Sequence, residues 1–159
     1  MDVAQVLAIW LHTVALVIAW GYYGILGRIA LPALERSLDP RALPTTLLSL
    51  ERRAVPLVVL SAVLFTLTGT YLLVIDPHYA GLGNVFASSW TLLMLVKHVL
   101  VVGFVALAVA VDLLVRRIAR TTDAERRAHD LRWLGLGAEG ATGLGALIVL
   151  LTAVAQVTA

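Results

Sequence analysis

The stretch Trp90–Val115, WTLLMLVKHVLVVGFVALAVAVDLLV, decides the fold, because it is an almost unbroken apolar run in which Lys97, His98 and Asp112 are the only ionisable side chains. A helix needs about 20 apolar residues to cross the ~30 Å hydrocarbon core of a bilayer. This stretch is therefore long enough to span a membrane as a single α-helix.

Three further stretches share these properties, and the four together predict an all-α membrane protein. The predicted spans are Val3–Leu26, Val55–Ile75, Trp90–Val115 and Leu134–Val157. The length of the chain favours one domain, an up-down bundle of four transmembrane helices over residues 1–159. Pro56 is expected in the first turn of the second span, where its missing N–H costs nothing. A short amphipathic interfacial helix is expected before it, around Leu43–Arg53.

Two details of the later spans carry expectations of their own. The segment 116–133 is expected to begin as an Arg-rich helical extension of the third span and to end in a turn, with Asp112 and Arg116 paired four residues apart. The fourth span contains Gly135, Gly137, Gly140, Gly143 and Gly145. Small residues allow helices to approach closely in lipid, so tight packing is expected along this span.

The composition excludes several classes of protein. Hydrophobic residues make up 60% of the chain and charged residues 14%, and the mean hydropathy is +0.94. A soluble domain is nearer half apolar and a quarter charged, so a soluble enzyme and a nucleic-acid-binding protein are excluded. The chain has no Cys, which excludes disulfides, iron–sulfur clusters and thiolate metal sites.

The arginines predict the orientation. All eleven lie either between the first and second spans or between the third and fourth. The positive-inside rule then makes both Arg-rich segments cytoplasmic and places both termini and the Asp76–Ser89 loop outside. The expectation is a multi-pass protein of the inner (plasma) membrane, with membrane lipids as its first partners.

Ionisable side chains inside a membrane are costly and are functional candidates. At 1.5 Å per residue, His12 lies ~14 Å and His98 ~12 Å from the outer ends of their spans, so both reach one level. The first and third helices of an up-down bundle are diagonal neighbours, ~11–14 Å apart. That gap suits a planar macrocycle held between two axial histidines, so His12 and His98 are the predicted ligands of a haem iron.

Other candidate cofactor-binding residues share faces or depth with these histidines. Gln5 and Tyr23 lie within ~20° of His12, and Met94 lies within ~40° of His98. On the second span, Gly69 would leave room for a flat ring, and a hydroxyl such as that of Thr66 would orient an imidazole N–H. Lys97 points ~100° away from His98. It either extends toward the interface or neutralises a carboxylate such as a haem propionate.

Two motifs resemble known membrane families. The pattern Trp10-Leu11-His12, then Trp20-Gly21 with Gly24, then Pro32 resembles the first helix of the copper-resistance protein D (CopD)-like family. The segment Trp90–His98 is similar to the third-helix segment of that family, which carries a Lys. HemJ-type protoporphyrinogen oxidases are also similar, with a His and a Lys that correspond to His12 and Lys97. The resemblance implies a small helical bundle that handles haem or porphyrin, or else copper.

The chain departs from the oxidase pattern in two places. Ile29-Ala30-Leu31-Pro32 stands where those oxidases have a Tyr/Phe-Leu-Pro-Arg-rich tail, and His98 supplies a second axial candidate that their pattern does not require. These departures favour a bis-histidine b-type cytochrome that transfers electrons, with a quinone or an external redox partner.

Other functions stay open. A HemJ-type oxidase would use His12 and Lys97, with Lys97 as its catalytic residue. A copper transporter would use His12, Met94 and His98, because thioether ligands suit Cu(I). A homo-oligomer, or a subunit of a larger membrane complex, is also consistent with the small extramembrane mass.

Overall fold

The helices of the predicted bundle are all present, and those of the second, third and fourth spans are longer than predicted. The computed structural model describes residues 2–79, 81, 86 and 88–158, with side chains described as far as Ala155. Its elements in chain order are α1 (Val3–Ile25), the π-helical η1 (Leu26–Ala30), α2 (Leu31–Ser37), α3 (Leu43–Ile75), α4 (Ser89–Arg120) and α5 (Ala124–Thr158). No strand occurs in these residues, which confirms the all-α class.

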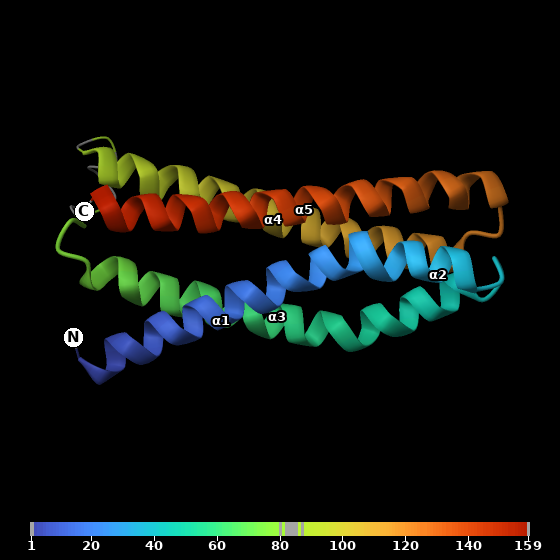
Figure 1. The fold of residues 1–159 in the computed structure, drawn as a ribbon, viewed down its shortest axis with the longest axis horizontal. Coiled ribbons are helices and arrows are strands. Elements are labelled where there is room, and N and C mark those ends of the chain that lie inside the picture. Colours follow the sequence, from blue (N-terminus) through green and yellow to red (C-terminus); the bar gives the residue numbers. More distant parts are fainter. Residues whose placement is uncertain (1, 80, 82–85, 87, 159) are drawn as a thin grey trace.

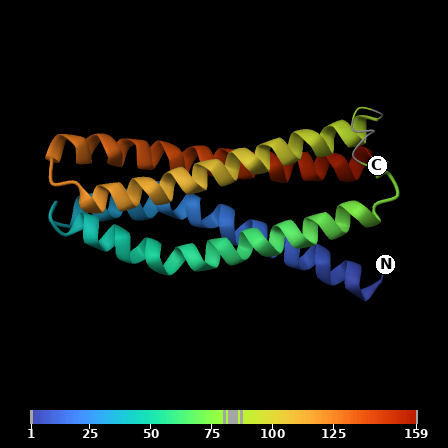
Figure 2. The same cartoon turned by 180° about the vertical axis from the view of Figure 1, so that it is seen from behind.

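The bundle runs up and down, as expected. Both termini lie at the same end as the connection from α3 to α4, and the other two connections lie at the opposite, Arg-rich end (Figure 1). The view from behind shows the same arrangement (Figure 2). α1 packs against α3 and α5, and α4 packs against the same two helices, so α1 and α4 are diagonal neighbours. Four helical segments are long and apolar enough to cross a membrane, and the chain is a multi-pass membrane protein.

The prediction for the start of the second span was wrong. α3 begins at Leu43 and has 33 residues, a length of about 50 Å. The separate interfacial helix expected around Leu43–Arg53 is the beginning of α3, and Pro56 lies inside the helix. Pro44 takes the first-turn position instead. Pro56 removes one backbone hydrogen bond, but Leu43 and Leu47, one turn apart, are 5% and 1% exposed and anchor the earlier turns in the core.

The Arg-rich extension of α4 is confirmed, but the prediction that segment 116–133 ends in a turn was wrong, because only residues 121–123 are non-helical and residues 124–133 begin α5. α4 continues to Arg120, and after a short connection α5 starts at Ala124. Arg116 Nε lies 2.8 Å from Asp112 Oδ2, as the spacing predicts. Arg117 Nε lies 2.9 Å from Oδ2 of the buried Asp130. This ion pair ties the extension of α4 to α5.

Glycine allows a close approach between α1 and α5. A Cβ on Gly145 would overlap the indole ring of Trp20. Trp20 Nε1 donates a hydrogen bond of 2.8 Å to the carbonyl of Thr142 on the same turn of α5. The indole therefore packs on bare backbone, and the tight packing expected of the glycine-rich helix is confirmed here.

Candidate functional site

Most of the predicted site residues line one cavity at the end of the bundle that carries the termini. We call it the His12 cavity; it has a volume of about 380 Å³, within the range of ~300–1,000 Å³ typical of small-molecule sites. All four long helices contribute to it. Six of the eight predicted residues are in its wall: His12, Thr66, Gly69, Met94, Lys97 and His98.

The imidazole of His12 is held by α3 through one nitrogen. His12 Nδ1 lies 3.0 Å from the carbonyl oxygen of Phe65 and 3.1 Å from Thr68 Oγ1. A carbonyl only accepts, so Nδ1 carries the proton and donates it to Phe65. Nε2 is then unprotonated, and it makes no hydrogen bond to any described residue. A histidine whose Nδ1–H is held by a carbonyl, with its Nε2 free, is the form that ligates metal ions.

Phe65 and Gly69 on α3 hold the imidazole ring of His12 in position. A Cβ built on Gly69 would lie 2.8 Å from His12 Cε1, so only glycine leaves room for the imidazole here. The ring of Phe65 stacks on the imidazole, with a centroid separation of 4.0 Å and an interplanar angle of 20°. Gly69 was expected to make room for a flat cofactor ring, and in the structure the histidine ring itself takes that room.

The hydroxyl that contacts His12 belongs to Thr68. Thr66 lines the cavity, but its hydroxyl donates to the carbonyl of Ala62, 2.8 Å away on its own helix. Sequence reasoning missed Phe65 and Thr68. The available signal was their spacing, because Phe65, Thr68 and Gly69 lie three and four residues apart and therefore share one face of α3.

His98 has the same tautomer on the opposite helix. Its Nδ1 lies 2.6 Å from the carbonyl oxygen of Met94, one turn earlier in α4, so Nδ1 donates the hydrogen bond and Nε2 is free of protein partners in the described chain. The side chain is exposed and lines the His12 cavity, so it lies on the open side. Two histidines from diagonal helices thus border one space, each with a free Nε2.

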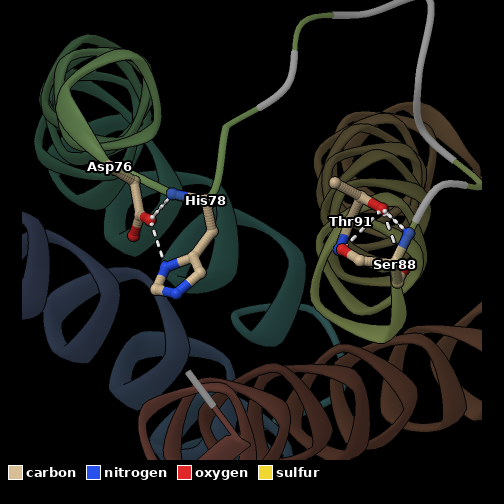
Figure 3. A network of polar contacts seen from close by, with 4 residues as sticks. All are labelled: Asp76, His78, Ser88 and Thr91. Carbon is tan, nitrogen blue, oxygen red and sulfur yellow. Dashed lines mark hydrogen bonds and ion pairs between the residues drawn. The ribbon is translucent and has the colours of Figure 1, made fainter.

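Lys97 lines the same cavity and is half-buried. It forms no ion pair with any described residue. Asp76 is also in the wall, but Asp76 Oδ1 accepts hydrogen bonds from the backbone N–H of His78 at 2.9 Å and from His78 Nδ1 at 3.0 Å (Figure 3). The ammonium group of Lys97 therefore has no direct ion-pair partner in the described part of the cavity wall.

A capping box fixes the start of α4, the helix that carries Met94, Lys97 and His98. Ser88 Oγ accepts a hydrogen bond from the Thr91 backbone N–H at 3.2 Å, and Thr91 Oγ1 accepts one from the Ser88 N–H at 3.1 Å (Figure 3). Such reciprocal bonds satisfy N–H groups that a helix start leaves free. They set where α4 begins and so hold its three site residues at their level.

Gln5 and Tyr23 are not part of the His12 cavity. Both share a helical face with His12, but they lie about 10 Å and 16 Å from it along α1. Gln5 is half-buried near the helix start, and Tyr23 lines a second cavity toward the Arg-rich end. Sharing a face therefore did not bring these residues to the depth of the histidine.

Comparisons with known proteins found no matching family model, and no significantly similar curated protein or solved structure. Among the described residues, no group of three or more His, Asp or Glu side chains is arranged to hold a metal ion. A haem iron needs only two axial ligands from the protein, and two histidines border the cavity.

Proposed function

We propose that this chain is an integral membrane b-type haem protein that transfers electrons, with His12 and His98 as the axial ligands. The observation that carries the proposal is the pair of imidazoles on diagonal helices that line one cavity. Each imidazole donates its Nδ1–H to a backbone carbonyl and leaves Nε2 free. This arrangement gives two ready-made nitrogen ligands, already in the tautomer that binds iron.

The residues around the histidines fit the same group. Bound haem supplies a one-electron redox centre, and two histidine ligands fill both axial positions, which favours electron transfer over oxygen binding. Phe65 and Gly69 fix the orientation of the His12 ring. Lys97 offers a positive charge to an acidic edge, such as a pair of propionates. Part of the wall is apolar, and the hydrophobicity around a site bears on its redox potential.

The position of the cavity suggests where electrons would go. It lies at the end of the bundle opposite the arginines. With the Arg-rich end in the cytoplasm, as the positive-inside rule favours, the haem would lie near the outer face of the inner membrane. An external redox partner would exchange electrons with the haem across that face.

A second candidate is a HemJ-type porphyrinogen oxidase. Lys97 lines the same cavity as His12 and has no ion-pair partner among the described residues. In this alternative His12 and Lys97 form the working pair, and His98 is dispensable. Copper transport through His12, Met94 and His98 is a third alternative, since all three side chains border the cavity.

Single substitutions on α4 separate these candidates. We expect His98→Ala to abolish the low-spin spectrum of bis-histidine haem and to reduce haem content about tenfold or more, because one axial ligand is lost. Lys97→Ala is expected to keep that spectrum. The measurement is the reduced-minus-oxidised absorption spectrum of each purified variant, with haem and copper content per chain.

His129→Ala is the matched control, because His129 is an exposed histidine on α5 whose Nε2 accepts a hydrogen bond from Trp133. Its spectrum should equal that of the wild type. Full haem content in His98→Ala, combined with loss of porphyrinogen oxidation in Lys97→Ala, would reject the cytochrome and favour the oxidase. Stoichiometric copper without haem would favour the third candidate.

A further inference from the structure

A second cavity lies next to the first and is not used by the proposed haem site. We call it the Tyr23 cavity; it has a volume of about 230 Å³ and is shared by α1, α3, α4 and α5. An apolar cavity of about 150 Å³ holds a benzene molecule. The Tyr23 cavity is therefore the size of one substituted six-membered ring. Its walls are mainly apolar and include Val55, Val58, Val101, Phe104 and Ile148.

Two hydroxyl groups in this wall belong to buried residues and have no hydrogen-bond partner among the described residues. Tyr23 is 3% exposed and Ser61 is 2% exposed, and both line the cavity. Neither hydroxyl makes a hydrogen bond within the described part of the chain. A hydroxyl that lines an apolar cavity without a partner can still both donate and accept a hydrogen bond. A ligand with polar atoms would supply partners for these two groups.

Two carboxylates that can accept hydrogen bonds also line the Tyr23 cavity. Asp112 Oδ1 is buried and has no hydrogen-bond partner among the described residues, while Arg116 binds the other oxygen. Glu51 is 3% exposed and accepts a hydrogen bond from the Tyr22 hydroxyl. Both carboxylates line the cavity. A fitting ligand is thus a small ring whose substituents both donate and accept hydrogen bonds.

The ligand would reach this cavity from the bilayer. Val59 on α3 and Val105 and Val109 on α4 line the cavity and are also exposed on the outer surface of the bundle. These residues mark a lateral opening between α3 and α4. A ring that enters there would leave an attached apolar tail in lipid, so the opening suits a lipid-soluble ligand.

We propose that the Tyr23 cavity binds the ring of a lipid-soluble hydroquinone, with its tail leaving between α3 and α4. Its two hydroxyls donate to the carboxylates and accept from Tyr23 and Ser61. Phe65, Thr66 and Val101 line both cavities, and Phe65 stacks on His12. The ring therefore lies beside the contact that holds the proposed haem ligand. The binding of this hydroquinone does not rest on the proposed function.

The test measures binding of a decyl-substituted benzohydroquinone to the purified protein in lipid nanodiscs by calorimetry. We expect Tyr23→Phe to raise the Kd about tenfold, because a buried hydrogen bond is lost while the ring that packs in the core is kept. Ala62→Leu, which fills the cavity from α3, should raise it at least as much. Tyr71→Phe is the control, since Tyr71 is an exposed tyrosine of α3 outside both cavities, and its Kd should not change.

Two further measurements keep this inference separate from the haem proposal. His98→Ala, whose side chain is outside the Tyr23 cavity, should bind the hydroquinone as the wild type does, and Tyr23→Phe should keep the haem spectrum. If the wild-type protein binds the hydroquinone but contains no haem, the proposed function is rejected and the hydroquinone site is supported. Unchanged Kd values in both Tyr23→Phe and Ala62→Leu would overturn the inference. Equal affinity for 1-decanol would also overturn it, because the tail alone would then account for binding.

Discussion

Replacing His12 with alanine is expected to remove the bound haem almost completely. The substitution deletes an imidazole that is stacked on Phe65 and fixed by the carbonyl of the same residue, and neither α1 nor α3 contains another histidine that could replace it. Loss of a residue that merely orients a ligand costs about 10- to 100-fold in metal affinity, so loss of the ligand itself should cost about 100-fold or more. Haem per chain after purification, from the absorption of the pyridine complex, measures the effect.

The control for this variant is His78→Ala. His78 is an exposed histidine at the same end of the bundle, bound to Asp76 and outside the wall of the His12 cavity. It should retain the haem content of the wild type. Wild-type haem content in His12→Ala would contradict the proposed ligation, because the iron would then have another axial ligand.

Gly69→Val is expected to have an effect nearly as large without removing any ligand. A Cβ at position 69 would lie 2.8 Å from His12 Cε1 and 3.3 Å from His12 Nδ1. The imidazole of His12 would have to move away from α3, and its hydrogen bond to the carbonyl of Phe65 would break. Because the orientation and tautomer of His12 depend on that bond, we expect haem content to fall about tenfold or more. The same haem assay and the redox difference spectrum report the change.

Gly143→Ala supplies the comparison for this variant. A Cβ at Gly143 on α5 would meet no atom within 4 Å, so the substitution adds a side chain to a membrane helix without a clash. Its haem content should equal that of the wild type. Gly69→Ala should fall between the two, since its single methyl group already conflicts with the ring. A fully haem-loaded Gly69→Val protein would show that haem binding does not require the packing of the His12 ring against α3.

The fold was largely predictable from sequence because its main determinants are local. The lengths of the apolar runs fix the number of helices, and short connections make successive helices antiparallel. The start of α3 was not predictable in this way. Pro56 favours a helix start when only local preference is considered, whereas burial of Leu43 and Leu47 against the other helices extends α3 by about three turns.

The site was only partly predictable, since its details depend on contacts between helices. Depth along the first and third spans was enough to place His12 and His98 at one cavity. The stacking ring of Phe65 and the Thr68 hydroxyl depend on the rotation of α3 against α1. The angular position of a residue around its helix did not by itself predict which cavity the residue lines. Tyr23 shares the face of His12 but lines another cavity, and Lys97 and His98 differ by ~100° yet border the same one.

The central claim, that two imidazoles bind one haem between α1 and α4, is tested most directly by the visible spectrum of the wild-type protein purified from haem-replete cells. Low-spin bis-histidine iron should give a sharp α band on reduction, with about one haem per chain. A colourless preparation, or a bound haem whose spectrum is the same in the His12→Ala, His98→Ala double variant, would contradict the account.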